Sequence, residues 1–312
     1  MTQFSVTGFG PASIGNLAVG FDILGLSLSG IYDEVTLTKR TDREIKISNI
    51  KGVTQNLPKE AHKNTCGAAL LAFQDKLNLN YGFDIAINKG IPLASGMGGS
   101  AASAVATVIA ANHFLSQPLE KNELLEFALA GEQVASGSAH LDNVAPSLLG
   151  GLCLCLKNNK VIKIPTSSEL NVVIFHPHIQ VETKVARSIL KDSISLNQYI
   201  EQSQYLAGFI SACYEGDFNL IAKSLKDVVI EPQRSKLIPH FYQYQQEVLK
   251  VDGVLGCSIS GAGPTMFALT NSDKSSLAVK QTFEQVAKLL NQSGKCWKLK
   301  INDQGAYTNE VH

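Results

Sequence analysis

The sequence has no excess of charge of either sign, because its 27 lysine and arginine residues are balanced by 27 aspartate and glutamate residues. A basic surface is the usual footprint of nucleic-acid or membrane binding, so this balance argues against both partners. No apolar run approaches the roughly 20 residues that span a bilayer. The N-terminal MTQFSVTGFGPAS also lacks a basic region followed by an apolar core. We therefore expect a soluble, unprocessed, cytoplasmic protein that binds a small molecule.

Cysteine pairs with the spacing of a zinc or redox site are also absent. The cysteines lie in apolar segments, and no two of them form a CxxC motif. Reduced thiols in the core fit this distribution better than disulfides or metal ligands. The six cysteines are Cys66, Cys153, Cys155, Cys213, Cys257 and Cys296.

The distribution of apolar residues predicts a mixed fold. At 312 residues the chain exceeds the size at which one hydrophobic core usually stops growing, so we expect two domains. Strand-like and helix-like segments both occur, without the strict alternation of a doubly wound sheet. The prediction is an α+β fold, divided near residue 160 into domains 1–160 and 161–312.

Individual elements follow from the period of the apolar residues. Asn64 precedes the helical spacing of TCGAALLAFQDKL and is a candidate N-cap, and GLCLCLKNNKVIKI predicts two strands joined at Asn158 and Asn159. The predicted strands are 4–7, 32–39, 44–50, 83–88, 171–175, 254–259, 265–269 and 296–301. The predicted helices are 66–77, 100–114, 120–135, 182–190, 241–250 and 275–290, with long helices up to about residue 225.

The loop IPLASGMGGSAASAV, residues 91–105, has three glycines but no lysine. A GxxxxGK[ST] nucleotide loop carries a lysine beside its last glycine, and here Gly99 is followed by Ser100. Glycines let the backbone approach a ligand, and the helix predicted after the loop directs unpaired N–H groups to the same point. The segment therefore predicts an anion site.

Two other interpretations of this loop remain open. The glycines also suit a sharp turn between a strand and a buried helix. Gly96, Gly98 and Ala101 match GxGxxA, the dinucleotide fingerprint, which requires an acidic residue at the end of the next strand about 20 residues on. Glu120 and Glu123 lie at that distance but begin a predicted helix.

Three further segments combine glycines with polar side chains. Taken singly, each is explained by turn chemistry or by a hydrogen-bonded loop residue. They are PASIGNLAVGFDILGLSL (11–28), GSAHLDNVAPSLLGG (137–151) and CSISGAGPTMFAL (257–269).

Together with the glycine loop, these segments resemble the galactokinase, homoserine kinase, mevalonate kinase and phosphomevalonate kinase (GHMP) family. PASIGNLAVGFDILGLSL is similar to the first signature motif, IPLASGMGGSAASAV to the second and SISGAGPTMFAL to the third. HLDNVAPSLLGG, ETKVARSIL and EPQRSKLIP further resemble the members that phosphorylate homoserine. The resemblance implies an N-terminal domain like ribosomal protein S5 domain 2 and a ferredoxin-like C-terminal domain.

The resemblance further implies ATP- and Mg²⁺-dependent phosphorylation of the hydroxyl of L-homoserine, in threonine biosynthesis, by an enzyme that we expect to be a homodimer. Backbone N–H groups of the loop would bind the phosphates, and Ser100 and Glu132 would hold the magnesium ion. The implied ATP-binding residues are Asn64, Thr65, Pro92, Leu93, Ala94, Ser95, Gly96, Met97, Gly98, Gly99, Ser100, Ala101 and Ala102.

The amino-acid substrate requires complementary groups. Two arginines suit its carboxylate, and an aspartate suits its ammonium. Phosphoryl transfer depends mostly on positioning, so we expect Asp142 to orient the hydroxyl rather than remove its proton. The implied substrate-binding residues are Asp22, His140, Arg187, Arg234 and Gly261, and the implied catalytic residues are Asn16, Asp142 and Asn143.

Two positions depart from the GSGLGSSA pattern of the second motif. Ala94 replaces its first glycine and Gly99 its first serine, so Ser100 must supply the remaining hydroxyl contact alone. A related kinase with another substrate is the nearest alternative, although such a substrate would not obviously require both Arg187 and Arg234. The other alternative is a binding module without activity. The retention of Ser100, Glu132 and Asp142 argues against it.

Overall fold

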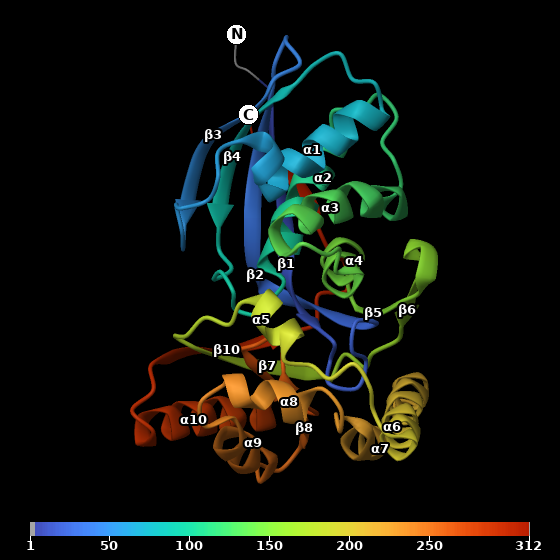
Figure 1. The fold of residues 1–312 in the computed structure, drawn as a ribbon, viewed down its shortest axis with the longest axis vertical. Helices are drawn as coiled ribbons and strands as arrows, with labels where there is room; N and C mark the ends of the chain where they lie inside the picture. The colour runs from blue at the N-terminus through green and yellow to red at the C-terminus, as the bar shows by residue number, and fades with distance from the viewer. Residues whose placement is uncertain (1–3, 312) are drawn as a thin grey trace.

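The computed structural model describes residues 4–311 and contains two β-sheets, each covered by helices (Figure 1). Within these residues the larger sheet has seven strands, in the order β11-β1-β2-β4-β3, with β5 paired to β2 and β6 paired to β5. The smaller sheet has four strands in the order β10-β7-β9-β8. Strands and helices are mixed without strict alternation, so the predicted α+β class is confirmed.

The elements of the first half of the chain build most of the larger sheet and its helical layer. The strands are β1 (Ser5–Gly15), β2 (Leu24–Lys39), β3 (Ile45–Gly52), β4 (Phe83–Lys89), β5 (Leu152–Cys155) and β6 (Val161–Ile164). The helices are η1 (Ala61–Lys63), α1 (Thr65–Lys76), α2 (Gly99–Asn112), α3 (Lys121–Ser136), α4 (Leu141–Leu149) and η2 (Lys157–Asn159).

The second half builds the smaller sheet and its helices. Its strands are β7 (Asn171–Pro177), β8 (Val254–Ile259), β9 (Met266–Thr270), β10 (Gly294–Lys300) and β11 (Tyr307–Val311). Its helices are α5 (Thr183–Ser188), α6 (Leu196–Glu215), α7 (Phe218–Ser224), α8 (Glu231–Arg234), η3 (Ser235–Leu237), α9 (Phe241–Leu249) and α10 (Asp273–Leu289).

The first two strands are longer than the sequence pattern predicted. The prediction for 4–7 covers only the start of β1, and the prediction for 32–39 covers only the end of β2. The two strands pair antiparallel from Ser5 opposite Thr38 to Gly15 opposite Gly25. At the far end both faces of the paired strands are covered, since the last six residues of β1 and the first five of β2 are all buried, and the alternation is lost there although the strands continue.

The sequence pattern predicts a loop over 137–151, and this prediction is wrong. It contains α4, in which Val144, Ala145 and Leu148 are fully buried against the sheet. The helix is short and holds Pro146, a residue that normally signals the end of a helix. Tertiary packing overrides that local preference.

The two sheets do not divide the sequence at a single point. β6, at residues 161–164, pairs with β5 in the larger sheet, and β11 pairs with the edge of β1. The chain therefore returns to the first domain after completing the second. That the main body of one domain ends, and that of the other begins, near residue 160 stays a prediction.

The topology around the glycine loop excludes the dinucleotide-binding interpretation. The loop follows β4, and the next strand, β5, pairs antiparallel with β2 and β6 and is not hydrogen-bonded to β4, so no strand–helix–strand unit of adjacent parallel strands is formed. Glu120 and Glu123 form the capping box that begins α3. GxGxxA thus lacks both the βαβ unit and the acidic strand end that it requires.

Apolar side chains form separate clusters on the faces of the sheets. One lies between the larger sheet and α1 to α3, one between the two sheets, and one between the smaller sheet and α9 and α10. The six cysteines are unpaired in the described structure, and all except Cys296 are buried, as predicted. Among residues 4–311, no helix is long and apolar enough to cross a membrane.

Candidate active site

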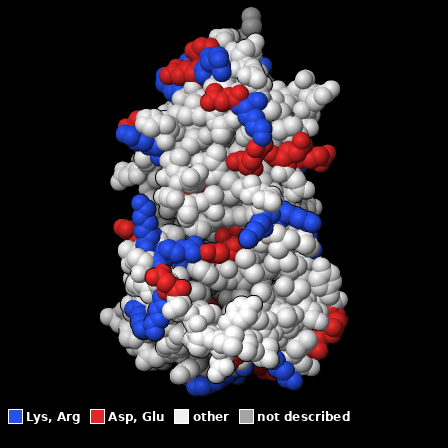
Figure 2. Space-filling view, turned by 45° about the vertical axis from the view of Figure 1, so that its right-hand side comes forward, with Lys and Arg blue, Asp and Glu red and all other residues white. Residues whose placement is uncertain are grey.

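A cavity of about 450 Å³ lies where the two domains meet. The glycine loop, α3 and α4 form one side of it, and α5, α8 and the turn after β8 form the other. Charges of both signs alternate across the middle of the face shown in Figure 2. The predicted residues that line the cavity are Asn16, Asp22, Pro92, Leu93, Ala94, Ser95, Gly96, Gly98, Gly99, Ser100, Glu132, His140, Asp142, Asn143, Arg187, Arg234 and Gly261.

Two glycines of the loop are required by close approach and by backbone conformation. Gly96 has φ +79°, and a Cβ there would lie 2.3 Å from the carbonyl oxygen of Ser260. Gly98 has φ +65°, and a Cβ there would lie 2.2 Å from Oγ of Ser13. Both positions thus exclude larger residues, because the loop is pressed between the first and third motifs.

The loop carbonyls are bonded to these neighbouring motifs. The N–H groups of Ser13 and Thr265 donate to Met97 O and Ser95 O, each at 3.1 Å. The hydroxyl of Ser260 donates to Gly96 O at 2.7 Å. With the carbonyls held in this way, the first N–H groups of α2, which have no partner within the helix, are available to an anion in the cavity.

The two departures from the family pattern have distinct structural consequences. Ala94 adopts φ +50°, the left-handed region in which a glycine would be unstrained. At Gly99, a Cβ would lie 3.1 Å from Cγ2 of Ile91 and 3.6 Å from Nζ of Lys89, both of which are buried. A side chain at position 99 therefore begins toward the interior, not toward the cavity.

Acidic groups gather on the α3 and α4 side of the cavity. Glu132 is 3% exposed, and its Oε1 lies 3.3 Å from Nδ1 of His140, the N-cap of α4. The hydrogen bond to Glu132 raises the pKa of His140. Asp142, in the first turn of α4, is 3% exposed, and burial raises its pKa to about 6, with a further increase from the charge of Asp22.

Asn16 connects three parts of the site. Its backbone N–H donates to Oδ2 of Asp142 at 3.2 Å, and its Nδ2 donates to the carbonyl oxygen of Gly261 at 3.0 Å. Its Oδ1 accepts the N–H of Asp22 at 3.0 Å. Asn16, Leu17 and Ala18 all have positive φ, so the turn is strained and is held by these tertiary bonds.

The two predicted arginines lie close together on the other side of the cavity. Arg187 donates to both carboxylate oxygens of Asp22, at 2.6 and 2.9 Å. Arg234 is 4% exposed and donates to Gly261 O at 2.9 Å and to Ala186 O at 3.2 Å. Burial lowers the pKa of Arg234 to about 10, and the charge of Arg187 acts in the same direction.

Phe21 is a residue that sequence reasoning missed. The guanidinium carbons of Arg187 and Arg234 lie 4.9 and 5.0 Å from the centre of its ring. An aromatic face attracts a cation, so one ring stabilises two like charges near each other. Its position beside Asp22 in the first motif was the available signal.

Some predicted residues do not line the cavity. Asn64 is the N-cap of α1, as predicted, since its Oδ1 accepts the N–H of Cys66 and its Nδ2 donates to Pro58 O. The side chains of Met97, Ala101 and Ala102 are buried in apolar clusters. Contacts of Asn64 and Thr65 with adenine stay predictions. Lining residues that were not predicted are Ala135, Glu182, Thr183, Lys184 and Ala262.

A two-domain fold in which a glycine loop at a helix N-terminus lines one cavity with two arginines is the arrangement expected of a small-molecule kinase. The GHMP kinases N terminal domain model matches residues 64–151, and the GHMP kinases C terminal model matches residues 209–293. The chain belongs to the GHMP kinase family, in the homoserine kinase group.

Individual relatives support this assignment. The chain is 45% identical over 260 residues to the homoserine kinase of Xylella fastidiosa strain 9a5c, covering 83% of this chain and 80% of the relative. It is 40% identical to that of Chlorobium phaeobacteroides strain BS1, covering 97% and 98%. The crystal structure of homoserine kinase from Cytophaga hutchinsonii matches with a TM-score of 0.95 and 38% identity, over 99% and 98% of the two chains. L. major mevalonate kinase, at 16% identity and a TM-score of 0.69 over 94% of each chain, shares the fold.

Proposed function

We propose that the chain transfers the γ-phosphoryl group of ATP to the side-chain hydroxyl of L-homoserine, giving O-phospho-L-homoserine and ADP. This is the step that feeds threonine synthesis. The observation that carries the proposal is the arrangement of Arg187, Arg234 and Asp22 opposite the glycine loop in one cavity. The names of relatives at 40–45% identity support it.

The amino-acid end of the substrate fits the side of the cavity formed by the second domain. Its carboxylate would bind to Arg187 and Arg234, whose guanidinium groups suit paired hydrogen bonds to a carboxylate. Its ammonium would bind to Asp22. Mevalonate and galactose have no ammonium group, so the pairing of two arginines with an aspartate favours an α-amino acid.

Asn16, Asp142 and Asn143 would orient the substrate hydroxyl toward the phosphates on the glycine loop. The hydroxyl oxygen forms a bond to the γ-phosphorus as the bond to the β,γ-bridging oxygen breaks, and the hydroxyl proton passes to solvent. This reaction needs mainly alignment and stabilisation of charge. The hydrogen bond from the N–H of Asn16 to Oδ2 of Asp142 supports an orienting role for this carboxylate rather than removal of the hydroxyl proton.

Magnesium would be held by Ser100 and Glu132. A hydroxyl and a carboxylate are oxygen donors of the kind that Mg²⁺ takes, and both side chains line the cavity. When bound, the ion would neutralise charge on the ATP phosphates. Within residues 4–311 no group of three or more His, Cys, Asp or Glu side chains is arranged to hold a metal ion.

We also propose a cytoplasmic homodimer that binds no nucleic acid. The resemblance to the family supports the dimer, and the balance of 27 basic with 27 acidic residues supports the lack of nucleic-acid binding. Light scattering after size-exclusion chromatography measures the oligomeric state directly, and a monomeric mass would contradict the dimer.

The test of the activity is ADP release in a coupled assay over homoserine, mevalonate, galactose and shikimate, each with and without Mg²⁺. We expect a signal with homoserine that depends on magnesium. A signal with another acceptor and none with homoserine would reject the substrate, and no signal with any acceptor would reject kinase activity on this panel.

A further inference from the structure

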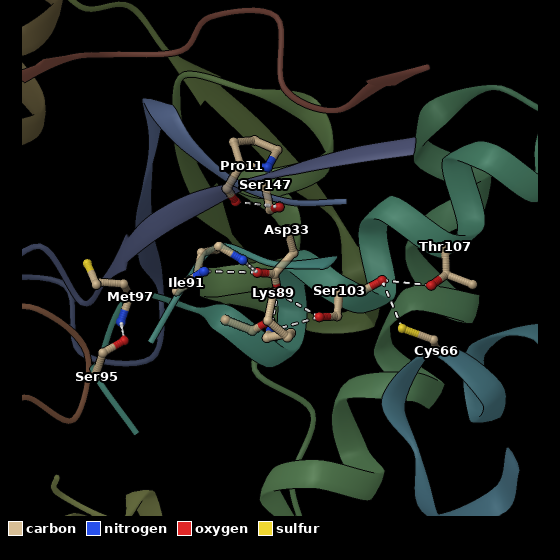
Figure 3. A network of polar contacts seen from close by, with 12 residues as sticks. Pro11, Asp33, Cys66, Lys89, Ile91, Ser95, Met97, Ser103, Thr107 and Ser147 are labelled. Atoms are coloured by element: carbon tan, nitrogen blue, oxygen red, sulfur yellow. Dashed lines mark hydrogen bonds and ion pairs between the residues drawn. The ribbon is translucent and has the colours of Figure 1, made fainter. Parts of the chain in front are cut away.

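A buried ion pair lies directly behind the glycine loop, outside the cavity. Asp33 in the middle of β2 is fully buried, and the side chain of Lys89 at the end of β4 is 2% exposed. Nζ of Lys89 contacts Oδ2 of Asp33 and donates to Oγ of Ser103 and to the carbonyl oxygen of Gly99, each at 2.9 Å. We call Asp33, Lys89 and Ser103 the Asp33 network (Figure 3).

The network holds both ends of the loop. Oδ1 of Asp33 accepts the N–H groups of Gly90 and Ile91, each at 3.0 Å, where the chain leaves β4. Lys89 binds the carbonyl oxygen of Gly99, where the chain enters α2. A single carboxylate and ammonium pair thus fixes the entry and the exit of residues 92–98.

The network leaves little freedom for its members. The three hydrogens of the Lys89 ammonium have three acceptors, and Oδ2 of Asp33 also accepts the hydroxyl of Ser103 at 2.6 Å. Such a fully bonded group in a dry environment has one geometry, because any displacement leaves a buried charge or polar atom unpaired.

Stability alone is a poor explanation for this pair. Desolvation offsets most of the attraction between buried charges, and well-packed apolar residues of similar volume are often as good. What a fully bonded buried pair supplies is fixed geometry. Here the fixed geometry is that of a loop that must present several N–H groups to phosphate at once.

We propose that the Asp33 network preorganises the glycine loop for ATP, with Lys89 as a positioning residue that acts through the Gly99 carbonyl. This inference rests on the proposed binding of ATP phosphates by the loop. The glycine loop has no lysine of its own. Its nearest buried cation is Lys89, which lies behind the loop backbone instead of beside the phosphates. A preformed loop binds nucleotide more tightly, because less conformational entropy is lost when the phosphates bind.

The test is nucleotide affinity in the Asp33→Asn/Lys89→Met double variant, which removes the charge pair without leaving one charge buried. We expect the Kd of a fluorescent ATP analogue, measured without homoserine, to rise at least 10-fold, and the KM for homoserine at saturating ATP to stay within about 2-fold. Hydrogen exchange of the amides in residues 92–100 should become faster.

The matched control is Ile85→Ala. Ile85 is a fully buried residue of the same strand, β4, and it belongs to the apolar cluster between the larger sheet and its helices. We expect Ile85→Ala to lower the Tm, while the nucleotide Kd and the exchange of residues 92–100 stay at wild-type values. If the control weakened nucleotide binding as much as the double variant does, a general loss of stability would explain both and the positioning role would be wrong.

Ser103→Ala provides a milder variant should the double variant fail to fold. It removes one partner of both charged groups and keeps the ion pair, and we expect a rise of about 3-fold in the nucleotide Kd, corresponding to one modest hydrogen bond. Wild-type affinity in a folded double variant, or in Ser103→Ala where the double variant does not fold, would overturn the proposal. Since these affinities need no homoserine, they are separate from the test of the phosphorylation reaction: a wild-type protein that binds nucleotide but does not phosphorylate homoserine would reject only the substrate.

Discussion

Arg187 donates two hydrogen bonds, at 2.6 and 2.9 Å, to the carboxylate of Asp22 across the mouth of the cavity. The two groups that the proposal assigns to opposite ends of the substrate are therefore paired with each other. Each side chain is 42% exposed, and ion pairs of this kind contribute little to stability. A bound amino acid can thus replace this ion pair at a small cost in free energy, with its carboxylate on Arg187 and its ammonium on Asp22.

Arg187→Gln should raise the KM for homoserine by about 100-fold, because a charged, two-point contact to the carboxylate is lost. The KM for ATP and the Tm should change little. Arg40→Gln is the control, since Arg40 is also paired with carboxylates, those of Asp42 and Asp84, but lies away from the cavity. Steady-state kinetics with each substrate varied separately measures both, and an unchanged KM for homoserine in Arg187→Gln would contradict the assignment.

Phe21→Leu should raise the KM for homoserine by about 5-fold, as expected when cation–π contacts to Arg187 and Arg234 are lost. Phe21→Tyr keeps the ring and should restore the wild-type value. The same kinetic assay distinguishes a cation–π effect from a packing effect. If only packing were lost, Phe21→Leu would lower the Tm, and the leucine and tyrosine variants would have the same KM for homoserine.

Asp142→Asn should keep the affinity for both substrates and lose less than about 10⁴-fold in kcat, the upper end for general-base assistance. The amide can still accept the N–H of Asn16 and so preserve the orientation of the site. Single-turnover measurement of the phosphoryl transfer step tests this. A larger loss with unchanged binding would show that Asp142 removes the hydroxyl proton.

The same variant should be more stable than the wild type at neutral pH. Burial raises the pKa of Asp142 from 3.8 to about 6, so the folded protein binds this proton more tightly than the unfolded chain. Stability is then lost as the pH rises from about 4 to 6, by at most about 3 kcal/mol. Urea unfolding without ligands should show Asp142→Asn to be stabilised at pH 7.5 and nearly equal to the wild type at pH 4. Equal stability at both values would contradict the raised pKa.

Gly99→Ser, which restores the residue common in the family, should destabilise the protein by about 1–2 kcal/mol, because its Cβ would lie 3.1 Å from Cγ2 of Ile91. We expect no decrease in the KM for ATP, since the new side chain begins toward the interior. Adding Ile91→Leu, which removes the Cγ2 branch and keeps the side-chain volume, should recover part of the stability. Thermal unfolding and ATP kinetics measure the two effects, and a lower KM for ATP in Gly99→Ser would mean that a hydroxyl at position 99 reaches the phosphates.

Local patterns predicted those elements whose signal is contained in a few neighbouring residues. Helices α1, α2 and α3 follow from apolar spacing and caps, and the structure places their ends within about two residues of the predicted ones. The predictions failed where burial on both faces removes the pattern, as in the first part of β2, or where packing overrides a proline, as in α4. β11 was missed because its pairing with β1 joins residues about 300 positions apart.

The sequence by itself determined the α+β class, the glycine loop at a helix N-terminus and most of the polar residues of the cavity, since these depend on residue type, on spacing and on three ordered motifs. Only the tertiary structure decided which side chains meet. It brings both Arg187 and Arg234 to the ring of Phe21, and it places Lys89 on the Gly99 carbonyl behind the loop. Spacing along the chain cannot predict such contacts, because they form between segments that only the packing of sheets and helices brings together.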